Sequence, residues 1–162
     1  MNNYLTQKEK MLLQDQQKHE ELCIRKYQSY ANQAQTQELK QLFNTYAGQE
    51  QQHLDTINQM LNGQIPNVAQ QGSQQQQNSV SPQIQRGMTN TVQTSLGNQS
   101  DKNLCVDALT TEKYVSGTYD TAIFEFTNPQ LRQVLNHIQK EEQQHGEGIF
   151  NYMQKNGMYN PQ

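Results

Sequence analysis

The chain contains an ungapped internal repeat, in which residues of its first part recur 92 positions later. The string Glu50-Gln51-Gln52-His53 returns as Glu142-Gln143-Gln144-His145, and Glu20 returns as Glu112. Other matching pairs are Lys10/Lys102, Leu12/Leu104, Asp15/Asp107, Tyr27/Tyr119, Leu39/Leu131 and Asn44/Asn136. A repeat without insertions indicates one structural unit used twice, so the fold must be built from two copies of that unit.

Each copy has the apolar spacing of two amphipathic helices, with steps of three and four residues. The four stripes read Leu13, Gln16, Glu20, Cys23, Tyr27, Tyr30, Ala34; then Leu39, Phe43, Tyr46, Glu50, His53, Ile57, Met60; then Cys105, Ala108, Glu112, Val115, Tyr119, Ala122, Phe126; and Leu131, Leu135, Ile138, Glu142, His145, Ile149, Tyr152. Helices with one apolar face must bury that face against one another. The sequence therefore predicts an all-α, antiparallel four-helix bundle made of two repeated helical hairpins.

Capping residues predict where these helices begin and end. Three of the helices should begin after residues that are good N-caps. Two should end at glycines, because glycine tolerates the left-handed backbone conformation that often ends a helix. These residues are Thr6 with Glu9 as a capping box, Thr36, Asn128 followed by Pro129, and the two stops Gly63 and Gly157. The predicted helices span about 6–34, 36–61, 100–126 and 129–155.

A segment of low complexity, residues 62–100, separates the two copies. It contains the run Gln74–Gln77 and the pair Ser81-Pro82, and it cannot supply a core. It predicts a long crossover connector outside the bundle, able to span helices of roughly 39 Å. The predicted organisation is one domain over residues 1–162, with hairpin one at about 6–61 and hairpin two at about 101–157.

Composition excludes several classes of protein. Hydrophobic residues make up 32% of the chain and its mean hydropathy is -1.04, which suits narrow apolar stripes better than a sheet sandwich. The net charge of -3 gives no basic footprint, so we expect no nucleic-acid partner. No apolar run approaches the roughly 20 residues of a membrane span, so we expect no membrane partner. Residues 1–10 lack the apolar stretch of a signal peptide. The spacing of Cys23 and Cys105 matches no zinc motif, so we expect both to be small buried side chains.

Polar residues interrupt each stripe near its middle. The first and third helices each place one glutamate there, and the second and fourth each place a Glu-x-x-His motif: Glu20, Glu112, Glu50 with His53, and Glu142 with His145. Glu20 and Glu50 are equally distant from the first predicted turn, and Glu112 and Glu142 from the second. Each lies about 15 residues, or roughly 22 Å, from its turn. If the hairpins pack as a pseudo-twofold pair, all six side chains converge.

Four buried carboxylates are unfavourable unless cations neutralise them. Two divalent ions carry the balancing charge when both histidines are neutral. One glutamate from each of two helices and Glu-x-x-His from the other two is the arrangement of di-iron and di-manganese carboxylate bundles of the ferritin-like type. We therefore predict that these six residues bind two divalent metal ions, iron or manganese. The alternative is a polar layer that holds no metal.

Other polar residues near the stripes receive simpler interpretations. Tyr27 and Tyr119 lie about two turns from Glu20 and Glu112, so core packing is favoured over redox work. Tyr46 is one turn from Glu50 and is the better redox candidate. Residues predicted to be solvated or at the boundary are His19, His137, Asp55 and Glu147. Gly146 and Gly148 each carry a helix-propensity cost of up to about 1 kcal/mol, and the sequence offers no reason for them.

The second half of the chain resembles the Coat F family of spore coat proteins. The resemblance covers about 60 residues and rests on Thr111-Glu112-Lys113-Tyr114, Asn128-Pro129-Gln130-Leu131-Arg132, Glu141-Glu142-Gln143-Gln144-His145 and Gly157-Met158-Tyr159. It implies a ferritin-like fold and a place in the endospore coat, after synthesis in the mother-cell cytoplasm. It also implies other spore coat proteins as partners, and it leaves open a homo-oligomer. It implies no known activity.

Three functions follow from these observations as hypotheses. The first is a structural spore coat protein whose bundle holds metal. The second is an oxidoreductase, akin to rubrerythrins or manganese catalases, that handles peroxide or O₂ at a dinuclear centre. The third is iron storage, which needs a closed shell of many subunits that nothing in the sequence specifies. Whether the chain is an enzyme is left open.

Overall fold

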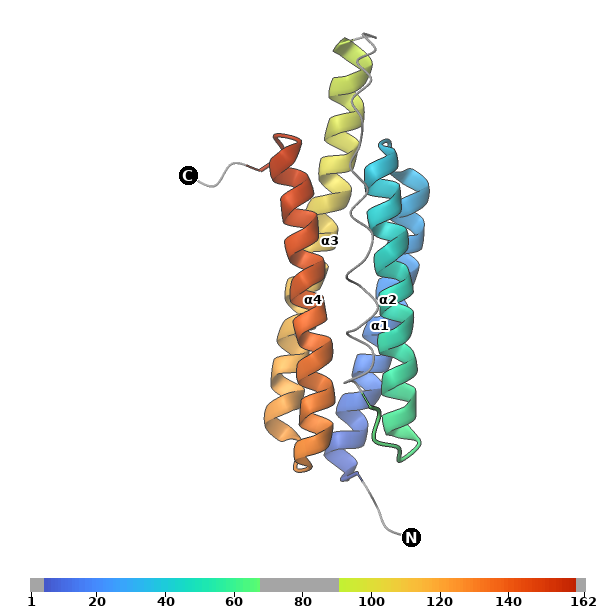
Figure 1. Ribbon diagram of the computed structural model, residues 1–162, viewed down its shortest axis with the longest axis vertical. Coiled ribbons are helices and arrows are strands. Elements are labelled where there is room, and N and C mark those ends of the chain that lie inside the picture. Colours follow the sequence, from blue (N-terminus) through green and yellow to red (C-terminus); the bar gives the residue numbers. More distant parts are fainter. Residues whose placement is uncertain (1–4, 68–90, 160–162) are drawn as a thin grey trace.

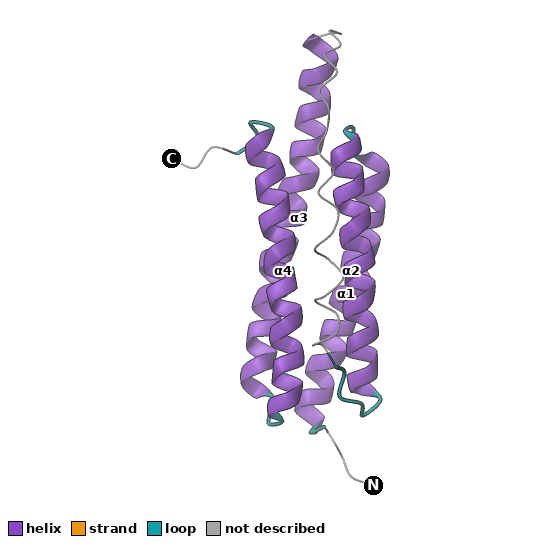
Figure 2. Ribbon diagram, viewed as in Figure 1, coloured by secondary structure: helices purple, strands orange, loops and turns teal. Residues whose placement is uncertain are grey.

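The computed structural model describes residues 5–67 and 91–159, and their side chains except those of 91–97. Its regular elements in these ranges are four helices: α1 Gln7–Gln33, α2 Gln37–Leu61, α3 Thr91–Glu125 and α4 Pro129–Lys155 (Figures 1 and 2). Helices α1 and α2 form one hairpin and α3 and α4 form the other, and the hairpins lie side by side. The predicted antiparallel four-helix bundle is confirmed.

The predicted caps account for the ends of the helices. Thr6 and Glu9 form the capping box of α1, the Thr36 side chain accepts from the Leu39 amide, and Asn128 accepts from the amides of the first turn of α4. Gly63 and Gly157 have φ angles of 80° and 67°, in the left-handed region that favours glycine. Both glycines therefore stop their helices, as predicted.

The third helix begins earlier than the sequence indicated. Its predicted start was residue 100, at the end of a connector placed at 62–100, whereas α3 begins at Thr91. This first part of α3 extends beyond the ends of the neighbouring helices (Figure 1). The sequence of 91–99 lacks an apolar stripe, and a helix that projects past its neighbours needs none, so periodicity could not reveal it. The rest of the predicted connector, 68–90, lies outside the described residues.

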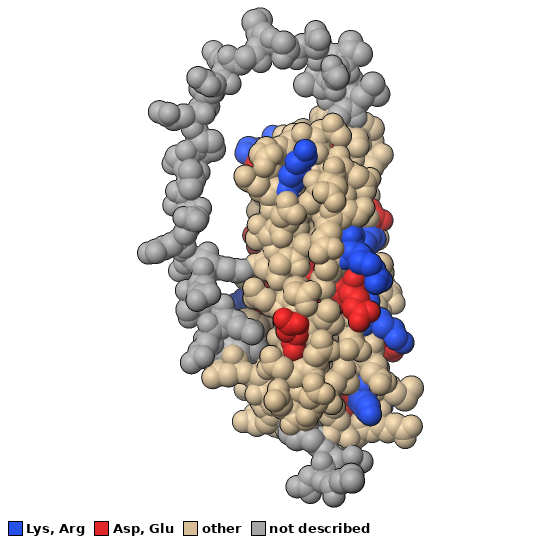
Figure 3. Space-filling view, turned by 90° about the vertical axis from the view of Figure 1, so that its right-hand side faces the viewer, with Lys and Arg blue, Asp and Glu red and all other residues tan. Residues whose placement is uncertain are grey.

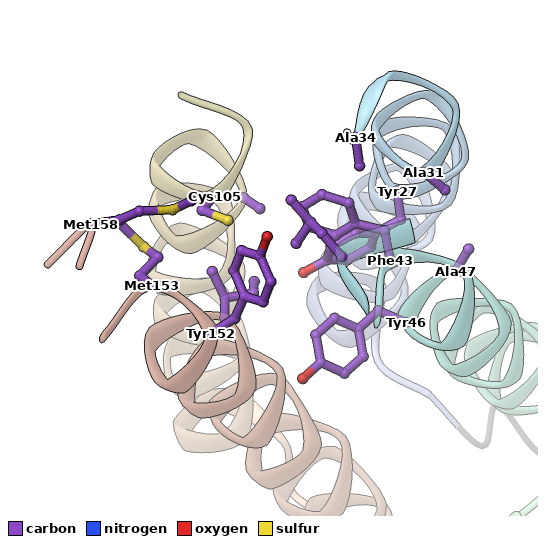
Figure 4. Close-up of a cluster of buried hydrophobic side chains, with 13 residues drawn as sticks. Tyr27, Ala31, Ala34, Phe43, Tyr46, Ala47, Cys105, Tyr152, Met153 and Met158 are labelled. Atoms are coloured by element: carbon purple, nitrogen blue, oxygen red, sulfur yellow. The ribbon is translucent and has the colours of Figure 1, made fainter. Parts of the chain in front are cut away.

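The core lies in two layers, one toward each end of the bundle. Tyr27, Phe43 and Tyr152 belong to the layer near the α1–α2 turn, where Tyr152 projects from α4 toward the aromatic side chains of the first hairpin (Figure 4). Tyr119, Leu131 and Leu135 belong to the layer near the α3–α4 turn. Every residue of the four predicted stripes is buried except Tyr30, which is partly buried. Cys23 and Cys105 are free and buried, as expected.

Two carboxylates tie the hairpins together at opposite ends of the bundle. Glu9 accepts hydrogen bonds from the backbone amide of Thr127 at 2.7 Å and from its hydroxyl at 3.0 Å. Asp101 accepts from the amides of Gln35 at 2.8 Å and Thr36 at 3.3 Å. Glu9 and Asp101 are repeat partners, so each hairpin uses the same position to hold the turn of the other.

The surface carries few charges. Figure 3 shows Lys and Arg side chains beside Asp and Glu along one edge of the face turned to the viewer, while most of that face is neither. Lys26 pairs with Asp107 at 2.7 Å, and Lys155 pairs with Glu38 at 2.8 Å. Within the residues that the structure describes, no helix combines the length and apolar character needed to cross a membrane.

Candidate metal centre

All six residues singled out from the sequence meet between the two core layers. Each is at most 2% exposed, and each comes from the middle of its helix: Glu20 from α1, Glu50 and His53 from α2, Glu112 from α3, and Glu142 and His145 from α4. The pseudo-twofold packing of the hairpins therefore places both Glu-x-x-His motifs in one buried centre.

The two histidines face this centre with their Nδ1 atoms. His53 Nδ1 lies 3.0 Å from Glu50 Oε2, 3.3 Å from Glu142 Oε1 and 3.7 Å from Glu20 Oε2. His145 Nδ1 lies 3.3 Å from Glu50 Oε1, 3.4 Å from Glu142 Oε2 and 3.7 Å from Glu112 Oε1. The two sets of contacts match closely, so the repeat in the sequence is also a repeat in geometry.

These contacts divide the centre into two overlapping groups of donors. One comprises Glu20, Glu50, His53 and Glu142, and the other comprises Glu50, Glu112, Glu142 and His145. In each group the ligand atoms lie within 4.8 Å of one another. Glu50 and Glu142 belong to both groups and could bridge two ions. Each remaining pair belongs to one group only: Glu20 with His53, and Glu112 with His145. Carboxylate and imidazole donors suit iron and manganese.

The outer nitrogen of each histidine has a hydrogen-bond partner from the opposite hairpin. His53 Nε2 lies 2.8 Å from Glu141 Oε2, and His145 Nε2 lies 2.8 Å from Gln49 Oε1. An acceptor at Nε2 keeps the proton on that nitrogen and leaves the Nδ1 lone pair directed inward in the neutral ring. Gln49 and Glu141 are repeat partners that sequence reasoning missed, although each directly precedes the glutamate of its motif.

Tyr27 and Tyr119 pack in the two core layers, as predicted, and each also donates a hydrogen bond to the centre. Tyr27 donates to Glu112 Oε1 and Tyr119 donates to Glu20 Oε1. Along its own helix, each tyrosine lies about two turns from the glutamate. Because α1 and α3 run antiparallel, each tyrosine is level with the glutamate of the other helix. Burial and the nearby carboxylate raise the pKa of both phenols, so they remain donors.

Charge is balanced by protons when no cation is present. Burial raises the pKa of Glu20 and Glu112, and Glu142 raises both further. Burial alone would lower the pKa of His53 and His145, but the surrounding carboxylates outweigh it and raise both. Burial also opposes ionisation of Glu50 and Glu142, yet interactions with the two histidines hold the pKa of each below its usual value.

The donor atoms satisfy one another poorly, which is what a metal site without its ion would show. Among the described residues, seven buried side-chain atoms have no hydrogen bond of acceptable geometry, and six of them belong to this centre: Glu20 Oε2, Glu50 Oε1, Glu112 Oε2, both carboxylate oxygens of Glu142, and His145 Nδ1. Buried polar atoms are normally paired, because an unpaired one costs about 1–3 kcal/mol. The residues present therefore fit two divalent ions.

A surface pocket lies between α3 and α4, beside the centre. Its volume is about 540 Å³, and Glu112 and Glu142 belong to its lining. Gly146 lies on its wall, where an added Cβ would stand 3.5 Å from Leu109 Cδ1 and 3.9 Å from Glu112 Cβ. A Cβ at position 146 would therefore pack in ordinary van der Waals contact with both side chains.

Gly148 makes room for Tyr46. A Cβ at Gly148 would lie 1.8 Å from Tyr46 Oη, and the Tyr46 ring packs on His145 with centroids 4.3 Å apart. Figure 4 shows Tyr46 projecting from α2 toward α4. The repeat partner of Gly148 is Thr56 and that of Tyr46 is Ile138, so this arrangement occurs in one half of the site. The structure supplies the reason for Gly148 that the sequence lacked.

Alanine at position 148 should therefore destabilise the protein by about 1–3 kcal/mol through overpacking, although alanine normally favours a helix over glycine. Urea unfolding of Gly148→Ala measures the cost. Gly48→Ala is the matched control, because a Cβ at Gly48 would meet nothing within 4 Å and should be neutral or stabilising. The Tyr46→Phe background should reduce the cost. An equal cost in both backgrounds would contradict the assigned contact.

The remaining polar residues lie outside the centre. Asp55 and Glu147 are exposed, as predicted. His19 and His137 are partly buried. His19 contacts the Tyr114 ring with centroids 5.6 Å apart, and His137 Nε2 lies 3.5 Å from Glu141 Oε1. His137 thus adjoins the outer partner of His53 without joining the six.

Comparison with protein families matches residues 100–162 to the Coat F domain. The match covers α4 and most of α3, including three of the six centre residues: Glu112, Glu142 and His145. No curated protein and no solved structure matches the chain.

Proposed function

We propose that this chain, whose residues 100–162 match the Coat F domain, is a spore coat protein whose bundle holds two divalent metal ions, iron or manganese. The first part is supported by the family match, and in this proposal the protein lies in the endospore coat among other coat proteins. The second part rests on the six buried side chains that meet between the core layers with unpaired donor atoms directed at one another.

In this proposal Glu50 and Glu142 bridge the ions, Glu20 with His53 holds one side, and Glu112 with His145 holds the other. Tyr27 and Tyr119 orient the outer carboxylates, while Glu141 and Gln49 fix the histidine rings. Bound ions would neutralise the carboxylates and supply Lewis-acid and redox chemistry. In a structural role, they would lock the two hairpins together. The melting temperature of the purified chain, with and without Mn²⁺ or Fe²⁺, tests this part.

A second function is favoured by one observation, the surface pocket whose lining includes Glu112 and Glu142. A metal that serves stability alone needs no access, whereas an oxidoreductase acting on peroxide or O₂ requires it. This alternative keeps the same six ligands and the same fold. Peroxide consumption by the metal-loaded protein separates the two functions.

The coat assignment predicts where the protein accumulates. A fluorescent fusion expressed from the native promoter should concentrate around the forming spore, because coat proteins assemble on its surface. Microscopy through sporulation measures this, and the fluorescent protein alone is the control. Strong expression in vegetative cells without enrichment at the spore would count against the assignment and favour a general role in peroxide handling.

A further inference from the structure

We propose that the outward surface of α3 binds a second copy of this chain, so that the two α3 helices pack antiparallel to each other. The central residues of this outer α3 face are Val106, Thr110, Gly117 and Phe124, which lie within about 20° of one line along the helix at roughly 100° per residue. None of them belongs to the metal centre. The proposal therefore goes beyond the function proposed above and does not depend on it.

The outer α3 face exposes large apolar side chains to solvent. Val106, Tyr114 and Phe124 are 47%, 63% and 83% exposed, and Tyr114 lies beside the central line. Among the residues that the structure describes, the other helix with exposed large hydrophobic side chains is α1, the neighbour of α3, with Met11 and Leu22. A single exposed hydrophobic residue is ordinary, whereas several aligned on one helix indicate an interaction surface.

The repeat provides an internal comparison for this face. The positions of α1 that match the four central residues are exposed and polar, and two of them are cationic: Gln14, Lys18, Arg25 and Asn32. Helices α1 and α3 have equivalent places in the two hairpins, so the packing of the bundle itself does not require an uncharged outer face. The loss of charge from α3 is explained if this face meets another protein surface.

Gly117 lies at the centre of the face and has no explanation within the chain. A glycine inside a helix costs up to about 1 kcal/mol relative to alanine. Gly148 is accounted for by the Tyr46 side chain, whereas a Cβ at Gly117 would meet nothing within 4 Å. Glycine allows another backbone to approach closely. A second helix crossing α3 at this point would supply the reason for Gly117.

Two exposed charges on the same edge of the face are complementary to each other. Within the described residues, the side chains of Lys113 and Asp120 form no ion pair and no hydrogen bond, whereas the acidic residues on the opposite edge of α3 pair with lysines of α1. Lys113 precedes Gly117 by four residues, and Asp120 follows it by three. One edge of α3 therefore carries opposite charges on either side of the glycine.

This arrangement of charge selects a second copy in the antiparallel direction. A twofold axis at Gly117 reverses height along the helix, so Lys113, about 6 Å from the axis, lies beside Asp120 of the partner subunit, about 4.5 Å from it. The axis forms this contact twice, as an interface between identical surfaces requires. In a parallel pair the same two residues would differ in height by about 10 Å. Exposed charge pairs add little affinity, but they determine the orientation of the partner.

Sedimentation velocity of the full-length chain, over a series of concentrations, tests the proposal. The wild type should associate to a dimer. Gly117→Arg, which copies the matching residue of α1, should raise the dimer dissociation constant by at least about tenfold, because a long charged side chain then occupies the centre of the contact. Gly48→Arg is the matched control on α2, where a Cβ also meets nothing within 4 Å, and it should leave the dissociation constant unchanged.

A charge exchange tests the antiparallel direction without altering a glycine. Lys113→Glu and Asp120→Lys should each weaken the dimer by at least about threefold, because each places like charges opposite one another. The double variant should recover the affinity of the wild type, since it restores both pairs with their signs exchanged. This result stands even if Gly117→Arg does not fold, which circular dichroism would reveal.

Several outcomes would overturn the proposal. A wild type that stays monomeric throughout the series would exclude self-association and leave the outer α3 face to a partner of different chemistry. An assembly that Gly117→Arg leaves intact, or that Gly48→Arg weakens equally, would use another surface. A double variant as weak as the single ones would contradict the antiparallel arrangement. None of these results bears on the bound metal, so the proposed metal centre is tested separately.

Discussion

Replacing Glu50 and Glu142 with glutamine should abolish the binding of two divalent ions. Both residues belong to both groups of donors, so their loss removes a bridging carboxylate from each ion. The amide keeps the shape of the side chain and removes its charge.

The size of the effect follows from the affinity of the ions. Binding to the folded state alone stabilises it by about 2.7 kcal/mol at a hundredfold excess of ligand over Kd. Mn²⁺ or Fe²⁺ should therefore raise the melting temperature of the wild type, and a chelator should lower it again. The double variant should show neither shift. Elemental analysis of protein purified without chelators provides an independent measure of the bound ions.

The matched control is the double variant Asp55→Asn and Glu147→Gln. It removes the same number of carboxylates two residues beyond each histidine, on exposed side chains outside the centre. Its metal-dependent shift should equal that of the wild type. If the wild type itself shows no shift, the six residues are a polar layer without metal, the enzyme hypothesis falls, and the structural coat protein remains.

Replacing Glu9 and Asp101 with alanine should cost about 1–3 kcal/mol for each residue, because each substitution leaves backbone amides at a helix turn without their charged acceptor. The two residues lie at opposite ends of the bundle, so their effects should add to roughly 2–6 kcal/mol. Urea unfolding of the single and double variants measures these losses. Glu21→Ala, at an exposed position of α1, is the control and should change little.

The Glu9 contribution should depend on pH. Burial alone would raise the pKa of this carboxyl, but hydrogen bonds from Thr127 and Thr6 outweigh burial and lower it. A lowered pKa means that the ionised group stabilises the folded state above its unfolded value of about 4.3, and that this stabilisation is lost as the pH falls further. The difference between the wild type and Glu9→Gln should therefore be largest near neutral pH and shrink below pH 4 or so. A difference independent of pH would contradict the role of the charge.

The repeat and the stripes were sufficient to predict the bundle and to bring six residues together. The reason is physical: a strict spacing of three and four residues fixes which side chains face inward, and equal distances from the turns fix their height. Glu20 and Glu112 could thus be matched with the Glu-x-x-His motifs before any contact was known. Whether they hold metal remains a prediction.

What the sequence could not supply was the pairing of one hairpin with the other. The hydrogen bonds of Tyr27 to Glu112 and of His53 to Glu141 cross between hairpins. Their register depends on how two separate surfaces slide past each other, which no spacing within a helix determines. For the same reason, the contact of Gly148 with Tyr46 could not be predicted from the sequence. One contact between the hairpins did leave a signal in the repeat. Glu9 and Asp101 are acidic at matching positions, and each binds the turn of the other hairpin.

The covalent link between the two hairpins has a consequence for how such a centre can change. Two identical hairpins associating as separate chains would carry the same residue at both equivalent positions. In this chain the two copies are encoded separately, so Leu54 and Gly146 can differ while the glutamates and histidines stay alike. A tandem chain can thus vary the surroundings of one half of the centre while it keeps the ligands of both, which an association of identical subunits cannot do by substitution.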